Sequence, residues 1–259
     1  MGKPLIPAQR REKIQEYLAF HQIARTVDLM DLLETSEATV RRDLEWLEQK
    51  GFLERTHGGA ILNQRVVFEQ EYQQRAQHFP EEKKHIGELA ASLIEEGDIV
   101  FINSGTTATQ VLHHIPRNPR ITVFTNNVSA LVDIGDPGFQ LFVTGGEYQA
   151  RSNSLAGRFA LDSVNLVFAN KAILGVDGIS LKHGLTVPTN PEAEVVRRMI
   201  ERTKGQVIVA ADHSKWGSVS NFPIADIDKM DALVTDTGFS QRAKKDLAEH
   251  SINVLISNQ

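Results

Sequence analysis

The 259-residue sequence contains neither cysteine nor a long apolar run. The absence of cysteine excludes disulfide bonds, thiolate zinc sites and a cysteine nucleophile. No apolar stretch approaches the roughly 20 residues that a bilayer-spanning helix needs. The first residues, MGKPLIPAQRREK, lack the apolar core of a signal peptide. We therefore expect a soluble, cytoplasmic protein that has no membrane partner.

The sequence also has no excess of basic residues. The formal charge of the chain is −5, and the contents of 41% hydrophobic and 24% charged residues are ordinary for a soluble globular protein. Residues 1–65 contain ten Lys and Arg residues and ten Asp and Glu residues. A nucleic-acid-binding surface in this region must therefore come from the arrangement of basic residues and not from net charge.

Periodic apolar residues predict three helices near the N-terminus. Pro7 can open the first helix, and Thr26 is a suitable N-cap for the second. Ser36 can cap a third helix that runs from Glu37 to about Lys50. Three apolar residues of this helix, spaced i, i+4 and i+7, form one stripe for burial: Val40, Leu44 and Leu47.

A two-stranded hairpin is expected after the third helix. Gly51 can end the helix in a left-handed conformation. Residues 52–55 and 60–62 have strand patterns, and a turn at 56–59 joins them. Three helices followed by such a wing form a winged helix-turn-helix. We therefore predict a DNA-binding domain at residues 1–62.

The third helix of such a domain enters the major groove of double-stranded operator DNA with its N-terminal residues at the base edges. Arg41 and Arg42 are the main candidates, because an arginine can grip guanine through two hydrogen bonds. The alternative is an ordinary solvated helix, since surface charge usually serves solvation. The other candidate DNA-binding residues are Ser36, Glu37, Ala38 and Thr39 on the helix, and Arg55, His57 and Gly58 on the wing.

From residue 81 the chain alternates between helix and strand patterns. This alternation predicts an α/β domain at 81–259, in which helices cover both faces of a mostly parallel sheet. The polar, weakly periodic residues 63–80 predict a partly helical linker. The expected strands are 98–102, 121–125, 140–144, 166–175, 206–211, 232–235 and 253–256.

Polar residues and glycines cluster near the ends of these strands, where ligands bind in open α/β sheets. Residues 104–107 (SGTT) follow a strand and open a helix, which makes them a natural phosphate site. Each signal alone fits an ordinary cap or turn. Together they supply the mixture of groups that a phosphorylated polyol needs. The candidates are Ser104, Gly105, Thr106, Thr107, Asn126, Asn127, Gly145, Gly146, Lys171, Asp177, Gly178, Asp212 and Lys215.

Both regions resemble the DeoR family of bacterial transcription regulators. Residues 36–44 (SEATVRRDL) and 51–60 (GFLERTHGGA) are similar to the DNA-binding signature of that family. Glu34 and Thr35 depart from it, because a β-branched apolar residue often precedes the serine. The series SGTT, TNN, TGG, GVDG, GLT and ADHSK is similar to the family's effector domain, whose fold is related to ribose-5-phosphate isomerase.

The resemblance covers about residues 8–256 and carries functional implications. It implies a transcriptional regulator, most often a repressor of a carbohydrate-use operon, that responds to a phosphorylated sugar. Residues 104–107 would hold the phosphate. The residues that would surround the sugar are Asn126, Asn127, Gly145, Asp177, Asp212 and Lys215, with Lys171 a weaker candidate. Because one winged helix covers few base pairs, we also expect a homo-oligomer. We expect no cofactor and no metal site, since the nine histidines lack ligand spacing.

Two alternatives to a regulator remain open. A sugar-phosphate isomerase would need a carboxylate base, for which Glu192 and Glu194 are the nearest candidates. However, Asn190-Pro191-Glu192 is also a plain helix start, so we assign no catalytic residue and do not expect an enzyme. The second alternative is an oligomeric scaffold that uses the α/β domain only for assembly.

Overall fold

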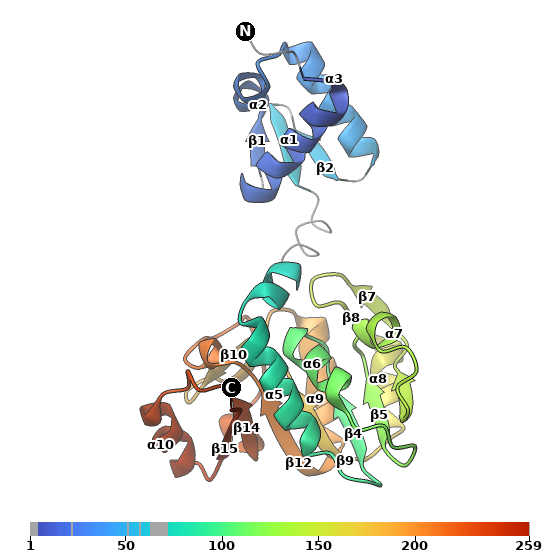
Figure 1. Cartoon of the computed structure of the whole chain (residues 1–259), viewed down its shortest axis with the longest axis vertical. Coiled ribbons are helices and arrows are strands. Elements are labelled where there is room, and N and C mark those ends of the chain that lie inside the picture. Colours follow the sequence, from blue (N-terminus) through green and yellow to red (C-terminus); the bar gives the residue numbers. More distant parts are fainter. Residues whose placement is uncertain (1–4, 22, 51, 57, 63–71, 259) are drawn as a thin grey trace. The chain divides into compact units, whose positions relative to one another are not determined.

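The computed structural model describes residues 5–21, 23–50, 52–56, 58–62 and 72–258 (Figure 1). The chain divides into two compact units, Met1–Glu71 and Tyr72–Gln259. Three of our expectations fall outside the described residues. They are the helix cap at Gly51, the wing residue His57 and the linker between residues 63 and 71.

The described part of the first unit has the expected winged helix-turn-helix architecture. Its helices are α1 (Pro7–His21), α2 (Thr26–Leu33) and α3 (Glu37–Gln49). Its antiparallel sheet has the order β1-β3-β2, with β1 (Ile23–Arg25), β2 (Leu53–Thr56) and β3 (Gly59–Leu62). The N-cap of α2 is Arg25 and not Thr26, because Arg25 keeps the extended conformation of β1.

The core of the first unit contains the apolar stripe expected on the third helix. Val40, Leu44 and Leu47 are buried together with side chains from α1, α2 and β2. Gly59 allows β1 and β3 to pair closely, because a Cβ atom at this position would lie 1.9 Å from the Ala24 carbonyl oxygen. The second glycine of the HGGA sequence is therefore required by the close pairing of the strands and not only by the turn.

A parallel sheet forms the centre of the second unit, as the alternating pattern predicts. Its order is β15-β14-β12-β9-β4-β5-β6, and its neighbouring strands are parallel. All seven expected strands are present. They are β4 (Ile99–Ile102), β5 (Thr122–Thr125), β6 (Gln140–Val143), β9 (Ala169–Leu174), β12 (Thr203–Ala210), β14 (Ala232–Thr235) and β15 (Asn253–Ile256).

Helices cover both faces of this sheet, as expected. On one face α5 (Pro80–Ser92) and α6 (Thr106–His114) lie side by side, and α7 (Ser129–Asp133) joins the same core (Figure 1). On the other face α8 (Arg158–Asn165), α9 (Asn190–Glu201) and α10 (Gln241–Glu249) bury their apolar residues. We did not expect α8, which is only eight residues long and buries only Ala160 and Val164.

Short strands and turns fill the connections near the carboxyl ends of the sheet strands. The sequence patterns indicated only turns in most of these places. The connections include a hairpin of β7 (Glu147–Gln149) and β8 (Ser154–Ala156), and a sheet of β10 (Gly178–Ser180), β11 (Gly184–Val187) and β13 (Phe222–Ala225). Two 3-10 turns, His213–Lys215 and Ile227–Lys229, complete them.

The boundary of the second unit lies earlier than the expected start at residue 81. Residues 72–77 are helical and belong to this unit. The Tyr72 hydroxyl lies 3.1 Å from the Ser129 hydroxyl, and the Phe79 ring packs edge-on against His213. We call residues 72–79 the strap. Its composition is polar, but its two aromatic residues attach it to the α/β body, so these residues are not linker.

Candidate functional site

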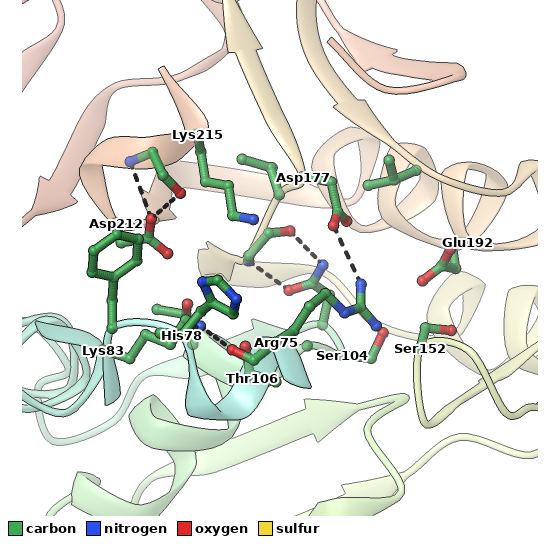
Figure 2. A pocket seen from close by; sticks show the side chains of 18 of the residues that line it. Arg75, His78, Lys83, Ser104, Thr106, Ser152, Asp177, Glu192, Asp212 and Lys215 are labelled. Atoms are coloured by element: carbon green, nitrogen blue, oxygen red, sulfur yellow. Dashed lines mark hydrogen bonds and ion pairs between the residues drawn. The ribbon is translucent and has the colours of Figure 1, made fainter. Parts of the chain in front are cut away.

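A cavity of about 270 Å³ opens at the carboxyl ends of the sheet strands, where the strap covers them (Figure 2). This volume is slightly below the roughly 300–1,000 Å³ of sites for drug-sized ligands, so it suits a small ligand. The described residues that line it are Arg75, His78, Phe79, Lys83, Asn103, Ser104, Gly105, Thr106, Thr107, Ser152, Gly175, Val176, Asp177, Val187, Glu192, Val196, Asp212, Ser214 and Lys215.

The turn between β4 and α6 forms the floor of this cavity. Gly105 is the N-cap of α6 and has a φ of 121°, a conformation that favours glycine. The Asn103 side chain donates to the Gly175 carbonyl at 2.9 Å and accepts from the Gly175 N–H at 2.7 Å. This pair of hydrogen bonds fixes the ends of β4 and β9 together. The free N–H groups of the first helical turn and the hydroxyls of Thr106 and Thr107 can therefore hold an anion.

Two lysines add positive charge at the same end of the cavity. Asp212 is buried and accepts from the Ser214 N–H at 3.1 Å, which shapes the 3-10 turn that carries Lys215. Lys83 of α5 is only 4% exposed. Burial lowers the pKa of Lys83 to about 8; the nearby Asp212 carboxylate opposes this change, and Lys215 and Arg75 reinforce it. These positions suit a phosphate group.

Carboxyl groups lie at another part of the wall. Asp177 pairs with Arg75 at 3.3 Å. Glu192 is 6% exposed and accepts a hydrogen bond of 2.7 Å from the Thr189 hydroxyl. Burial raises the pKa of Glu192, whereas hydrogen bonds from Thr189 and Ser152 act in the opposite direction. The cavity therefore offers N–H and ammonium groups for an anion, and carboxyl and hydroxyl groups for a polyol (Figure 2).

Seven of the thirteen sequence-predicted effector residues line this cavity. They are Ser104, Gly105, Thr106, Thr107, Asp177, Asp212 and Lys215. Asn126 and Asn127 do not line it. They are buried at the end of β5, where Asn126 donates to the Leu155 carbonyl and Asn127 donates to the Thr109 hydroxyl, each at 2.9 Å. Their side chains therefore stabilise the body around the cavity.

Three predicted glycines also lie outside the cavity lining. Gly145 and Gly146 follow β6, and a Cβ atom on Gly146 would lie 2.4 Å from the Ala156 carbonyl oxygen. A Cβ atom on Gly178 would lie 2.5 Å from both the Ser218 carbonyl and the Thr186 hydroxyl. At Gly146 and Gly178, close packing accounts for the glycine without any ligand.

The expectation for Lys171 needs a correction. Its ammonium group lies 2.7 Å from the Asp98 carboxylate and donates to the Leu93 carbonyl at 2.7 Å. Both acceptors precede β4, whereas the cavity follows β4. Because β9 begins at Ala169, Lys171 lies near the amino end of its strand, away from the cavity. There it forms a buried ion pair with Asp98.

Sequence reasoning missed the contributions from the strap, from the β7–β8 hairpin and from α9. Glu192 was considered only as an isomerase base or a helix start, although its side chain faces the cavity (Figure 2). No spacing signal marked the strap residues, because Arg75 meets Asp177 across 102 positions of sequence. The polar lining residues that were not among the candidates are Arg75, His78, Lys83, Asn103, Ser152, Glu192 and Ser214.

The candidate DNA-binding arginines lie on the solvent face of α3. Arg41 is 66% exposed and pairs with Glu37 at 2.6 Å, and Arg42 is also exposed. Ser36 occupies the N-cap position, but its hydroxyl pairs with the Thr39 hydroxyl at 3.0 Å and not with a backbone N–H. On the helix, Glu37 and Ala38 are exposed and Thr39 is half-buried. On the wing, Gly58 is exposed.

Behind this face, a buried carboxylate holds α3 in place. Asp43 accepts hydrogen bonds from Arg10 at 2.7 Å and from Arg11 at 2.9 Å, both on α1. On the wing, Arg55 pairs with Glu48 of α3 at 2.7 Å. The α1–α3 and α3–wing contacts therefore fix the exposed arginines relative to the wing.

Comparison with known proteins identifies the family. The sequence model of the DeoR-like helix-turn-helix domain matches residues 10–66, and that of the DeoR C-terminal sensor domain matches residues 78–237. The chain belongs to the DeoR family. As a DeoR-family protein it is a DNA-binding transcriptional regulator and not an isomerase.

Similar proteins support this DeoR assignment over nearly the whole chain. The HTH-type transcriptional repressor GlcR of Bacillus subtilis is 34% identical over 255 residues, which cover 97% of this chain and 96% of that protein. The HTH-type transcriptional regulator GlpR of Haloferax volcanii is 30% identical, with coverages of 97% and 98%. A solved ribose 5-phosphate isomerase A from Methanocaldococcus jannaschii has 13% identity and a TM-score of 0.37, with coverages of 52% and 53%. That structural likeness is too low to add to the DeoR assignment.

Within the described residues of this DeoR-family chain, no helix combines the length and the apolar character needed to cross a membrane. The same residues contain no group of three or more His, Cys, Asp or Glu side chains arranged to hold a metal ion.

Proposed function

We propose that this DeoR-family regulator binds double-stranded operator DNA through α3 and the wing, and that a phosphorylated sugar in the cavity changes this binding. The cavity is the observation that carries the proposal. It combines a helix N-terminus and two lysines, which suit a phosphate, with carboxyl and hydroxyl groups, which suit a polyol. The target would be an operon for carbohydrate use, and the protein would act in the cytoplasm, where that operon lies.

Two relatives support repression as the direction of control. GlcR and the Agrobacterium fabrum protein AccR are both named as transcriptional repressors. Because a repressor of sugar-use genes is needed only when the sugar is absent, we propose that the sugar phosphate releases this regulator from its operator. We further propose a homo-oligomer, because one recognition helix contacts only a few base pairs and repeated half-sites increase the specificity.

The DNA-binding part is tested by changing the exposed arginines. Arg41→Ala or Arg42→Ala should weaken binding by about 1–3 kcal/mol if the arginine contacts guanine, and the preference at that base should relax. If it contacts phosphate, binding should weaken for all sequences and the salt dependence should decrease by about one charge. The probe would be DNA that the wild-type protein selects from a random pool, and affinity would be measured by mobility shift.

Arg158→Ala is the matched control, because Arg158 is an exposed arginine on α8 of the sensor unit. It should bind the selected DNA as the wild type does. If Arg41→Ala and Arg42→Ala also bind like the wild type, α3 is not the recognition helix.

The effector part is tested by Thr106→Ala and Lys215→Ala. Each variant should lose the response to sugar phosphates and keep its DNA affinity in their absence, because both residues lie in the cavity. Lys182→Ala is the control, since Lys182 is exposed and does not line the cavity. Calorimetry with a panel of pentose and hexose phosphates would accompany the mobility shifts. An unchanged response in both cavity variants would show that the effector binds elsewhere.

A further inference from the structure

The strap is one wall of the cavity and also the first segment of the sensor unit after the DNA-binding unit. Arg75, His78 and Phe79 of the strap line the cavity together with Lys83 of α5 (Figure 2). A ligand in this cavity therefore lies against the segment of the sensor unit that is nearest in sequence to the DNA-binding unit.

The strap is held to the sensor body by two kinds of contact. At its ends, the Tyr72 hydroxyl lies near the Ser129 hydroxyl and Phe79 packs on His213. In its middle, the Lys83 ammonium donates to the carbonyl oxygens of Arg75 and His78, the latter at 2.5 Å. The groups that hold the middle of the strap therefore face the cavity.

Lys83 also faces the part of the cavity that suits an anion. Its charged neighbours are Asp212, Lys215, Arg75 and Glu82. Two neutral carbonyls are weaker acceptors for an ammonium group than a phosphate dianion, because the hydrogen bond to an anion is charge-assisted. A phosphate bound between the start of α6 and Lys215 would therefore compete with the strap for Lys83.

One buried polar atom of the strap lacks a hydrogen-bond partner. Arg75 uses its terminal nitrogens for Asp177 and for the Arg151 carbonyl, but its buried Nε has no hydrogen-bond partner. An unsatisfied buried donor makes this arrangement of the strap less stable than it would otherwise be. A rearrangement of the strap is therefore energetically accessible.

We propose that the Lys83 ammonium is shared between the strap and the effector, so that binding of a phosphate in the cavity frees the carbonyls of Arg75 and His78 and loosens the strap. This inference rests on the proposed function, because it assumes that the cavity takes a phosphorylated ligand. It adds the residue that senses the phosphate and the segment that responds.

The proton on Lys83 gives this exchange a measurable signature. Burial has already lowered the pKa of Lys83 to about 8. A phosphate dianion beside the ammonium stabilises the charged form and raises the pKa. Above about pH 8, phosphate binding should therefore be accompanied by proton uptake at Lys83. A purely structural lysine that does not contact the ligand would give no such uptake.

The experiment uses amide hydrogen exchange of the full chain, with and without ribose 5-phosphate, fructose 6-phosphate and glucose 6-phosphate as probes. In the wild type, amides of residues 72–79 should exchange about tenfold faster when a probe binds. Lys83→Gln should show this faster exchange without any probe and no further change on adding one. Lys84→Gln is the matched control, because Lys84 is the exposed neighbour on the same helix. It should behave as the wild type does.

Lys83→Arg serves as a second variant in case Lys83→Gln does not fold. It keeps a positive charge at this position but does not titrate in the accessible pH range, so it should bind the probes without proton uptake. Calorimetry at about pH 8.5, in buffers of different ionisation enthalpy, should show proton uptake in the wild type and in Lys84→Gln but not in Lys83→Gln or Lys83→Arg.

The outcomes separate the two proposals. If a probe binds to the wild type without changing strap exchange or taking up a proton, the role of Lys83 is wrong and the cavity remains an effector site. If Lys83→Gln shows wild-type strap exchange without a probe, the role of Lys83 is also wrong. If none of the sugar phosphates binds, the proposed function fails, and this inference fails with it.

Discussion

At the scale of single residues, the buried charged groups divide between those that meet another residue and those that face the cavity. Asp43 and Lys171 lie in ion pairs with Arg10 and Asp98. Lys83 and Glu192 face the cavity, and burial shifts the pKa of each toward the neutral form. Because a nearby ligand changes such shifts, these two groups predict how binding and stability depend on pH.

Effector affinity should fall as the pH rises through about 8. The bound phosphate favours charged Lys83, and the free protein loses that proton at a pKa of about 8. Affinity for a sugar phosphate should therefore decrease by up to about tenfold per pH unit above this value. Calorimetry between about pH 7 and pH 9.5 measures it. Lys83→Arg should remove the decrease, since a guanidinium stays charged; a decrease of the same size in Lys83→Arg would assign the effect to another group.

Glu192→Gln should stabilise the sensor unit, and the gain should grow with pH. Burial raises the folded-state pKa of Glu192 above its ordinary value of 4.5, so the folded state binds more protons than the unfolded state. The stability that this provides is full below the unfolded pKa and is lost as the pH rises through the folded pKa. Glutamine avoids that loss.

Thermal unfolding of Glu192→Gln and the wild type between about pH 5 and pH 8 would test this. Glu194→Gln is the control, because Glu194 lies two positions further along α9 and is exposed. A difference between Glu192→Gln and the wild type that shrinks toward high pH would contradict the expected sign.

At the scale of elements, the adjacent residues Arg42 and Asp43 of α3 lie on its exposed and its buried side, respectively. Arg42 is exposed, whereas Asp43 is 1% exposed and binds two arginines of α1. The arginine-arginine-aspartate motif at residues 41–43 therefore contains both an exposed part and a packing part. A substitution of Asp43 should therefore lower the stability of the first unit and should not change base recognition directly.

Asp43→Ala should destabilise the first unit by about 3 kcal/mol, because it leaves Arg10 and Arg11 largely buried without their carboxylate. Trp46 lies on α3 near Arg11 and reports on this unit, whereas Trp216 lies in the second unit. Urea unfolding followed by fluorescence in a Trp216→Phe background would measure the loss. Glu45→Ala, at an exposed position of α3, should change stability little. Equal effects of the two substitutions would mean that the ion pairs with α1 are unimportant.

At the scale of the whole molecule, the position of the unit boundary decides whether the cavity is complete. The second unit begins at Tyr72, and three cavity-lining residues precede α5: Arg75, His78 and Phe79. A sensor fragment that starts after them would lack one wall and would expose Lys83 to solvent. Truncation therefore distinguishes the boundary at residue 72 from the boundary expected at residue 81.

A fragment of residues 72–259 should bind sugar phosphates with about the affinity of the full chain, because it contains every lining residue. A fragment of residues 81–259 should bind at least about tenfold more weakly, since it loses the lining side chains of Arg75, His78 and Phe79. Calorimetry measures both, after circular dichroism has shown that each fragment is folded. Equal affinities would show that the strap takes no part in binding.

The sequence predicted most of the architecture, because the relevant signals are local. Each strand of a parallel sheet is buried on both faces and appears as a short apolar run, so all seven strands could be located. The stripe of Val40, Leu44 and Leu47 likewise marks the buried side of the third helix. The helix α8 was missed, because its eight residues are fewer than the window over which helical periodicity can be recognised.

The sequence also determined the part of the site that one turn of chain can build. Residues 104–107 form the floor of the cavity, since a glycine and hydroxyl residues between a strand and a helix specify that geometry locally. The tertiary structure decided the rest. Arg75 reaches Asp177 across 102 positions, Glu192 arrives from α9, and Lys171 faces Asp98 instead of a ligand. Such contacts depend on which elements meet in space, and the spacing of residues along the chain carries no record of them.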